Sequence, residues 1–366
     1  MLMASPRLLL TLSTVLLALA ACGRPAAAQG RAVGYGGGAT GGTTPCHFSD
    51  APGLRACLGR GGAEAIADAP LTVDPGKDRI QVAANTTLDG RGLLTIAPSA
   101  IGLAITQSNV IVRNTFFHGP GPSQTLFPAI HPGSNCTTPT LPKQLLGCAV
   151  DINLSGAVRD VWIDHDTFWQ CGNRCVNGSD YGDGKGRPDA VTISDSVFRD
   201  SYFSVVFGVN ATVPVLPPPG YVTLYGNVFD HIFRRAPRAA GGYRMHVFNN
   251  YYRDWGGQTY LGSPSVGCGE AFKGFGPSVN GTSEMLLEAN VAEAGECREA
   301  VDNSYFTPAE GYARGNGRVR AVGNLGLRGA TISGSDALDF TPTYPYSLMP
   351  ADRVKAWVMA NAGARP

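Results

Sequence analysis

A short phrase of alternating apolar residues recurs along the middle of the chain. Two apolar residues stand two positions apart, a small polar residue follows three positions later, and an aromatic residue comes two positions after that. Clear copies start at Val161, Val191, Val222 and Met245 and end at Phe168, Phe198, Phe229 and Tyr252, and fainter ones start at Met285 and Val319. Alternation with a period of two is typical of strands that bury one face, and the polar residue predicts a sharp turn.

One such unit cannot bury its own apolar face, so successive units must stack. The repeats therefore predict an all-β fold, a parallel β-helix in which each strand pairs with its counterpart one coil away. An antiparallel β-sandwich is the alternative, but it needs two-residue Asn-Gly hairpin turns, which are scarce here. The segment Pro350–Ala362 has apolar residues at helical spacing and is closed by Gly363, which predicts a C-terminal helix.

Polar segments interrupt the repeats and divide the chain. Residues 119–148, 172–189 and 211–220 are rich in Gly, Pro or Asp, so we expect long loops there. Residues 29–45 are rich in Gly and Thr and predict a flexible tether. The expected organisation is an export signal over residues 1–28, this tether, and one β-helix domain over residues 46–366.

The first 28 residues have the form of an export signal. Arg7 precedes the apolar run 8–21, which is too short to span a bilayer comfortably. Its end, Leu-Ala-Ala-Cys, resembles a bacterial lipoprotein signal in which Cys22 becomes the lipidated first residue. A cut after Ala28 would instead release a soluble protein. Both interpretations predict export, either as a secreted protein or as a lipoprotein of the periplasm or outer surface.

The composition favours a large globular domain with no general attraction to polyanions. Of the 366 residues, 43% are hydrophobic and 16% are charged, and the formal net charge is +1. Such a balance creates no field that steers the protein to nucleic acid, so any anion site must be local. We expect a monomer with no nucleic-acid partner.

The cysteine count fits export. Besides Cys22 there are eight: Cys46, Cys57, Cys136, Cys148, Cys171, Cys175, Cys268 and Cys297. An even number in an exported chain predicts disulfides, and pairing between sequence neighbours is the simplest arrangement. We expect Cys136–Cys148 and Cys268–Cys297 first, because loop-like sequence separates each pair. A metal site at Cys171 and Cys175 is the alternative, although no nearby pair completes a tetrahedral set.

Two motifs connect the chain to a known family. Val161-Trp162-Ile163-Asp164-His165 is one, and Arg235-Ala236-Pro237-Arg238 followed by His246-Val247-Phe248-Asn249-Asn250 is the other. They resemble, in sequence and in order, the signatures of family 1 polysaccharide lyases, the pectate and pectin lyases. The resemblance runs from about Ile80 to the end of the chain. It implies a right-handed parallel β-helix (a solenoid) that cleaves polygalacturonate-type chains by β-elimination.

The chemistry of that reaction decides which residues matter. Elimination removes the proton at C5 of a galacturonate, and the oxygen at C4 leaves. The neighbouring carboxylate acidifies this proton poorly, because proton loss adds negative charge to a group that is already charged. A site must therefore neutralise the carboxylate, supply a base and stabilise the enolate-like state. A metal ion or an arginine can neutralise the carboxylate.

The resemblance assigns the arginine motif to these tasks. It makes Arg235 the base, which requires a site that is positively charged and shielded from water; the alternative is a carboxylate clamp. Arg238 matches the second arginine and is expected to bind substrate, with a structural salt bridge as the alternative. The third arginine is missing, since Ala240 stands there. Asp164 is expected to support substrate near the active face.

The resemblance also implies a Ca²⁺ site, and this site is altered here. Asp151 matches its first carboxylate, while Asn173 and Asn177 replace the other two. Loss of two charges predicts weak Ca²⁺ binding, unless Asp180, Asp183 or Asp189 compensates. Arg174, in the same loop, resembles the arginine that pectin lyases carry near the metal position. It is expected to act as a built-in cation in contact with substrate, with an exposed loop arginine as the alternative.

One further substitution bears on the substrate. Phe203 stands where the family often has a carboxylate-binding lysine, and an aromatic surface favours less charged, methyl-esterified chains. The sequence thus predicts an exported pectate lyase-like enzyme whose partner is pectate, pectin or a related acidic polysaccharide. The alternatives are a metal-independent pectin lyase that uses Arg174, and a non-catalytic β-helix protein that binds acidic polysaccharide.

Overall fold

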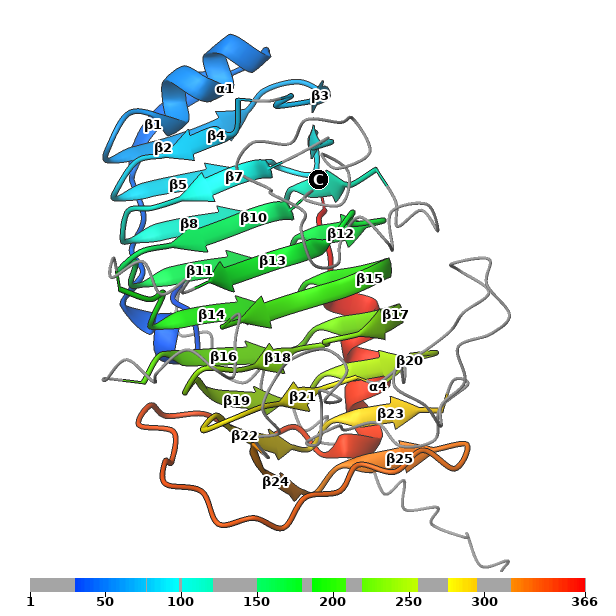
Figure 1. The fold of residues 1–366 in the computed structure, drawn as a ribbon. Helices are drawn as coiled ribbons and strands as arrows, with labels where there is room; N and C mark the ends of the chain where they lie inside the picture. The colour runs from blue at the N-terminus through cyan, green and yellow to red at the C-terminus, as the bar shows by residue number, and fades with distance from the viewer. Residues whose placement is uncertain are drawn as a thin grey trace, which may run out of the picture.

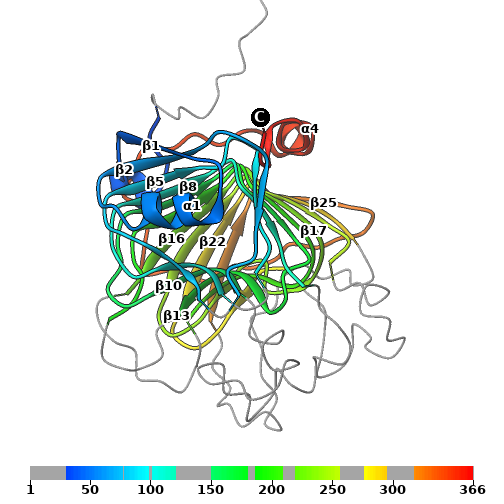
Figure 2. The same ribbon diagram turned by 90° about the horizontal axis from the view of Figure 1, so that it is seen from above.

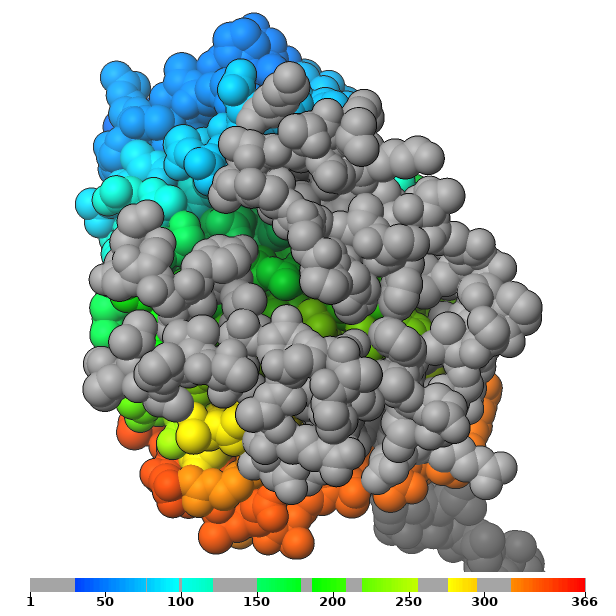
Figure 3. All heavy atoms as spheres, in the orientation of Figure 1, coloured from blue at the N-terminus to red at the C-terminus, as the bar shows by residue number. Residues whose placement is uncertain are grey.

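The computed structural model describes residues 30–76, 78–98, 101–120, 150–179, 186–208, 219–255, 276–294 and 317–365. These residues wind into a right-handed parallel β-helix whose coils stack from the N-terminal to the C-terminal end (Figure 1). Viewed along the stack, the strands form three faces around one core (Figure 2). Figure 3 shows the first orientation in space-filling form, with the N-terminal coils in blue at one end and the C-terminal segment in orange at the other. The predicted fold class is confirmed.

The first face is a ten-stranded parallel sheet. In spatial order its strands are β1 (Thr44–Phe48), β2 (Ala63–Ala67), β5 (Thr86–Asp89), β8 (Val110–Arg113), β11 (Val161–Asp164), β14 (Val191–Ser194), β16 (Tyr221–Tyr225), β19 (Arg244–Phe248), β22 (Glu284–Glu288) and β24 (Arg318–Val322). The repeated phrase of the sequence begins in these strands, and its apolar positions point into the core.

The second and third faces belong to one larger sheet. The second face contains β3 (Leu71–Val73), β6 (Leu94–Ile96), β9 (Phe116–His118), β12 (Thr167–Trp169), β15 (Val197–Phe207), β17 (Val228–Arg234), β20 (Tyr251–Arg253), β23 (Val291–Glu293) and β25 (Leu325–Leu327). The third face contains β4 (Ile80–Val82), β7 (Ile101–Ile105), β10 (Val150–Ser155), β13 (Arg174–Ser179), β18 (Arg238–Ala239) and β21 (Ser278–Val279). The long strand β15 joins them, because it pairs with β12 at its start and with β13 at its end.

The aromatic position of the repeat builds a column of rings inside the second face. Phe117, Phe168, Phe198, Phe229 and Tyr252 stack in this order, with ring centroids 4.7 to 5.1 Å apart. The polar position builds a second column at the turn between the first and second faces, formed by Asn227, Asn250, Asn290 and Asn324. The four clear repeats thus each add one ring to the first column, and the asparagine column continues into the two fainter repeats.

Two helices complete the described fold. Helix α1 (Ala51–Leu58) lies at the N-terminal end of the stack, and helix α4 (Ala351–Asn361) runs along the second face (Figures 1 and 2). Val354 and Val358 of α4 pack against Val228, Tyr251 and Val291. The C-terminal helix predicted from the apolar spacing is confirmed. Among the described helices, neither is long and apolar enough to cross a bilayer.

Residues 30–43 are not the flexible tether that their composition predicts. They contain the 3-10 helix η1 (Tyr35–Gly38) and cross the outside of the first face. Backbone amides of Tyr35, Gly36 and Gly42 donate to the hydroxyls of threonines on the sheet, at 3.1, 2.9 and 3.1 Å. A Cβ at Gly36 would lie 2.5 Å from the carbonyl oxygen of Val161, so this glycine serves close approach and not flexibility. The β-helix itself also starts earlier than expected, at Thr44 in β1.

Two disulfides lie in the described residues, Cys46–Cys57 and Cys171–Cys175. Both join sequence neighbours, which confirms the simplest pairing for these four cysteines and rules out a metal–thiolate site at Cys171 and Cys175 in this state. The predicted pairs Cys136–Cys148 and Cys268–Cys297 lie outside the described residues. So do Cys22, the predicted export signal, and most of the predicted loops 119–148 and 211–220. The predicted loop 172–189 is described except for residues 180–185, and it contains a strand, β13, where a loop was expected.

Gly36→Ala tests the packed N-terminal segment. The added Cβ would clash with the backbone of β11 and β14, so we expect the free energy of unfolding to fall by about 1–3 kcal/mol. Urea unfolding followed by circular dichroism measures it. Gly37→Ala is the matched control, because its Cβ meets its nearest neighbour at 3.1 Å and needs a smaller adjustment. Equal stability of Gly36→Ala and the wild type would show that this segment is detached in solution.

Candidate active site

The register of the third face and of the adjoining strands β15 and β17 places two of the predicted site residues, Asp151 and Arg235, in one row. The strands pair through the positions Val150, Arg174, Phe203 and Arg234. The next residues along each strand form the adjacent row, which contains Asp151, Cys175, Ser204 and Arg235. Neighbouring strands lie about 4.8 Å apart, so Asp151 and Arg235 are separated by roughly 14 Å, or three strand spacings. The row has a carboxylate at one end and a guanidinium at the other.

Asp151 is a buried carboxylate without a hydrogen-bond partner. Its exposed fraction is 0%, and neither side-chain oxygen has a partner among the described residues. Burial raises the pKa of Asp151 well above its usual range, because desolvation penalises the charged form. A group in this position takes up a proton or a cation, since an unpaired buried charge is costly.

The two asparagines that replace carboxylates differ from each other. Asn173 precedes β13 and is buried, and its side-chain oxygen has no partner among the described residues. Asn177 lies within β13, where its side-chain oxygen accepts a hydrogen bond from Nη1 of Arg174 at 2.7 Å. The amide nitrogen of Asn177 donates to the side-chain oxygen of Asn153 at 2.6 Å. The side-chain oxygen of Asn177, one of the three predicted metal ligands, is therefore already bonded to Arg174.

These contacts test whether the described residues fit a calcium ion. Ca²⁺ usually takes six to eight oxygen ligands. Asp151 and Asn173 offer oxygens without partners, whereas Asp189 pairs with Arg159 at 2.7 Å and accepts from the backbone of Tyr221. Asp180 and Asp183, which could also compensate, lie outside the described residues. The described donors fit a weak site with one carboxylate.

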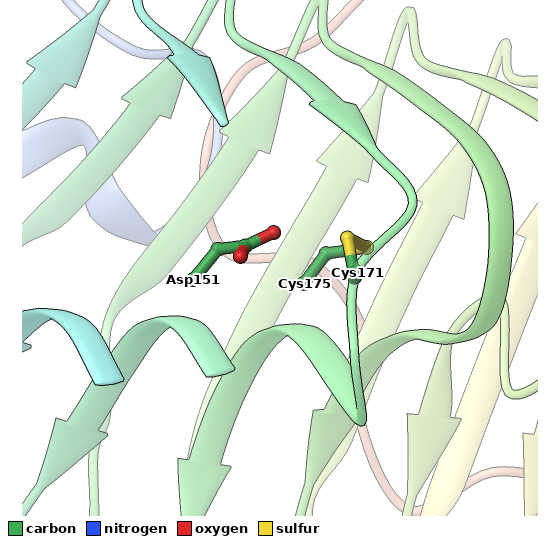
Figure 4. Close-up of side chains that lie close together, drawn as sticks. All are labelled: Asp151, Cys171 and Cys175. Carbon is green, nitrogen blue, oxygen red and sulfur yellow. A yellow bond between two sulfur atoms is a disulfide. The ribbon is translucent and has the colours of Figure 1, made fainter. Parts of the chain in front are cut away.

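A disulfide lies beside Asp151 on the same face (Figure 4). The sulfur atoms of Cys171 and Cys175 and a carboxylate oxygen of Asp151 lie within 4.8 Å of one another. The bond closes a short loop that carries Asn173 and Arg174, and the backbone amide of Cys171 donates to the hydroxyl of Ser201 at 3.0 Å. The loop that would hold a metal is therefore covalently closed.

Arg235 is fixed through both its backbone and its side chain. Its φ of +64° lies in the left-handed region that non-glycine residues rarely adopt. Its carbonyl oxygen accepts from the backbone amide of Val205 at 3.2 Å and from the hydroxyl of Ser204 at 2.9 Å. Its guanidinium carbon lies 3.8 Å from the centroid of the Phe203 ring. The neighbouring strand β15 thus holds a strained backbone that presents this arginine.

Arg234 is a functional candidate to which the sequence analysis assigned no role. It is fully buried, and its guanidinium carbon lies 5.4 to 5.6 Å from the ring centroids of Tyr202, Phe203 and Phe233. Its Nη2 also donates to the hydroxyl of Tyr202 at 3.2 Å. The only feature of the sequence that pointed to Arg234 was its position next to Arg235. Its aromatic partners on β15 belong to another coil, so the sequence alone did not show that they would be neighbours.

Arg238 lies on the same face but in a different row. On β18 it pairs with Val206, which is in register with Asn177 of β13. It is 2% exposed, and its Nε donates to the side-chain oxygen of Asn280 at 3.0 Å. The structure therefore brings Arg238 near the predicted substrate surface and holds it with an amide group.

The structure does not bring Asp164 to this surface. Asp164 lies on β11 of the first face, where its carboxylate contacts Nδ1 of His165 at 2.7 Å and accepts from the hydroxyl of Ser194. The neighbouring Trp162 packs against Ala32 and Ala39 of the N-terminal segment. This corrects the predicted substrate-binding role: Asp164 ties adjacent coils together beneath that segment.

A family model described as pectate lyase matches residues 61–366. The chain belongs to the pectate lyase family. A pectate lyase of Bacillus subtilis is 27% identical over 305 residues, which cover 78% of this chain and 65% of that protein. The crystal structure of Jun a 1, the major allergen of cedar pollen, superimposes with a TM-score of 0.67 at 20% identity and covers 92% of this chain and 93% of that one. A pectate lyase from Bacillus sp. N165 in complex with trigalacturonate gives a TM-score of 0.59 at 17% identity, with coverages of 90% and 98%.

The pectate lyase fold gives the altered positions a common location. Asn173, Asn177 and Phe203 all lie on or beside the third face, on β13, the loop before it and β15. The changes are therefore concentrated on the surface that carries Asp151 and Arg235, and the core columns keep the repeat pattern. The chain spans 65% of the length of the Bacillus subtilis relative.

Asp151→Asn should stabilise the metal-free protein at neutral pH. The pKa of Asp151 is higher in the folded state than in the unfolded state. Below the ordinary carboxyl pKa, Asp151 is protonated in both states and costs no stability. As the pH rises through the raised pKa of the folded state, the protein loses stability. We expect the variant to be about 1–3 kcal/mol more stable at pH 7 in chelator and equal to the wild type near pH 3. Thermal unfolding across this pH range measures the difference.

Asp189→Asn is the matched control, since it breaks the pair with Arg159 and should gain no stability at any pH. If Asp151→Asn behaved like this control, Asp151 would have to be paired in solution.

Proposed function

We propose that the protein is an exported lyase that cleaves polygalacturonate-type chains by β-elimination on its third face. The observation that carries this proposal is the row that ends in Asp151 and Arg235, with Arg235 held on the ring of Phe203. Membership of the pectate lyase family and the likeness to a relative that binds trigalacturonate support it.

In this proposal Arg235 removes the proton at C5. The electron pair of the C–H bond forms the double bond between C4 and C5, the C4–O bond breaks, and the leaving oxygen takes a proton from water. Arginine must be neutral to act as a base, and burial beside other cations favours the neutral form. Arg234, Arg235 and Arg238 are 0%, 8% and 2% exposed, so the motif meets the requirement for a shielded cluster.

Arg238 and Arg174 supply fixed positive charge for substrate carboxylates. An arginine fork matches a carboxylate in geometry and stays charged at neutral pH. Arg174 is half-buried and held by Asn177, so its position does not depend on a bound ion.

Asp151 and Asn173 would hold a calcium ion weakly if one binds. A bound Ca²⁺ would help to neutralise the carboxylate of the galacturonate that loses its proton. One carboxylate gives little attraction to a divalent ion in the absence of substrate. The chain's own arginines therefore carry most of the charge compensation.

A metal-independent lyase for methyl-esterified pectin is the second candidate. The bond between Arg174 and Asn177 favours it, because a guanidinium already contacts a predicted metal ligand. So does Phe203, an apolar ring where the family often has a lysine. A non-catalytic protein that binds acidic polysaccharide remains the alternative of a different class. Export, with or without a lipid at Cys22, rests on the first 28 residues.

Arg235→Ala should abolish elimination and leave the fold intact. A positioned base contributes roughly 10²–10⁴-fold to the rate, so we expect a loss of that size or more. The ultraviolet absorbance of the unsaturated product measures turnover on pectate and on methylated pectin. Arg159→Ala is the matched control and should keep full activity, because Arg159 is an exposed arginine that pairs with Asp189. Near-native turnover in Arg235→Ala would exclude Arg235 as the base.

Calcium dependence should be weak. We expect activity that survives chelation or that needs millimolar Ca²⁺, because one carboxylate replaces three in the predicted site. The assay is elimination of pectate and of methylated pectin, each with and without chelator. Preference for methylated pectin in chelator would select the second candidate. Calorimetric binding of micromolar Ca²⁺ to the substrate-free protein would contradict this prediction.

A further inference from the structure

The ring of Phe203 has two guanidinium groups within the distance of a cation–π contact. The guanidinium carbon of Arg235 is 3.8 Å from its centroid, and that of Arg234 is 5.4 Å from it. Phe203 on β15 is also the register partner of Arg234 on β17 and of Arg174 on β13. The ring is 3% exposed, so its contacts are with protein and not with bulk water.

The ring itself is fixed by its surroundings. Phe203 clusters with Tyr202, Val206 and Phe233, apart from the main core of the β-helix. The rings of Tyr202 and Phe203 have centroids 4.2 Å apart and are inclined by 50°. A side chain that is packed on several sides presents one orientation, which is what a residue that positions another group requires.

We propose that Phe203 is a positioning residue of the lyase reaction, whose ring face holds the guanidinium of Arg235 in place. The inference rests on the proposed function, because it gives Arg235 the role of base. A distance of 3.8 Å to the ring centroid places a cation well inside the range of a cation–π contact. An arginine has several rotatable bonds, and the contact selects among its conformations before substrate arrives.

The same contact influences when Arg235 gives up its proton. A cation–π contact favours the charged guanidinium, so the ring raises the proton affinity of Arg235. Nearby cations act in the opposite direction. In the described residues, the strands around it carry Arg174 on β13, Tyr202 on β15, Arg234 on β17 and Arg238 on β18. Arg199 and Asp200 of β15 and Asp230 and His231 of β17 pair with one another nearer the starts of these strands.

If Phe203 positions Arg235, its removal should change the pH dependence of the reaction. A purely structural role of Phe203 would not produce this change. Loss of the ring should lower the proton affinity of Arg235, so the rising limb of the pH–rate profile should move to lower pH. The size of a cation–π contact sets the shift at up to about one pH unit. Misplacement of the base should at the same time reduce kcat, by roughly 10- to 100-fold, with little change in KM.

The test compares four variants in the full-length protein. Phe203→Leu removes the ring and keeps an apolar side chain, whereas Phe203→Tyr keeps the ring and should retain both the activity and the wild-type pH profile. Phe203→Lys places an ammonium group beside Arg234 and Arg235 and should lose activity on all substrates. Phe233→Leu is the matched control, since its ring belongs to the same cluster and is 5.5 Å from Arg234.

The decisive comparison is Phe203→Leu against Phe233→Leu in kcat, KM and pH profile, with thermal unfolding to verify that both are folded. We expect a shift of the pH profile in the first and none in the second. Equal effects of the two variants, or an unshifted profile in Phe203→Leu, would overturn the proposal. Full activity of Phe203→Lys would do the same.

A second readout does not need activity. In the ¹⁵N–¹H spectrum of arginine side chains, the Nε–H signal of Arg235 should be displaced by the ring current of Phe203, as assigned by its loss in Arg235→Lys. The displacement should disappear in Phe203→Leu and persist in Phe233→Leu. If it is present but the wild type is inactive on pectate and pectin, the proposed function fails while the contact stands. If it is absent, the positioning role fails even in an active enzyme.

Discussion

Register between coils is the constraint on which the rest of this structure depends. It is enforced at the turn between the first and second faces, where the oxygen of Asn250 accepts from both the backbone and the side-chain amide of Asn227, at 2.9 Å each. Asn290 and Asn324 continue the pattern in the next coils. Because side chains alternate between faces, a slip by one residue would turn every outward group inward. Asp151 and Arg235 share a row only because no coil slips.

A fixed register allows groups that each destabilise the fold to be placed in one region. A buried carboxylate without a partner, a fully buried arginine and a non-glycine residue at positive φ each cost stability. All three lie on the third face or at the adjoining end of β17, at Asp151, Arg234 and Arg235. The ring column and the apolar core of the repeats stabilise the stack on the opposite side of the same strands, so the site does not have to contribute to its own stability.

The sequence predicted those features of the fold in which the position of a residue follows from its place in the repeat. The β-helix, helix α4 and the columns of rings and asparagines follow from local spacing, and disulfides between neighbours need no knowledge of the fold. The N-terminal segment was mispredicted because a glycine-rich composition is the same for a flexible tether and for a segment packed closely on a sheet. Gly36 is there for the close packing. Asp164 was assigned to the wrong face for a different reason. Alternation along a strand indicates whether a side chain points into the core or out to solvent, but it does not indicate which of the three faces contains the strand.

The contacts around the arginines could not be predicted for a related reason. Arg234 and Arg235 contact Phe203 of the adjacent coil, and the register between these two coils is set by the number of residues in the turns. The Arg174–Asn177 bond depends on how the closed loop before β13 enters the strand. In the proposed function, these contacts explain how a chain with a net charge of +1 attracts an acidic polymer. Arg174, Arg234, Arg235 and Arg238 gather on one face, while burial favours the neutral form of Asp151. In the described residues of this face the positive charge is therefore built into the strands, and a metal ion would add to it rather than create it.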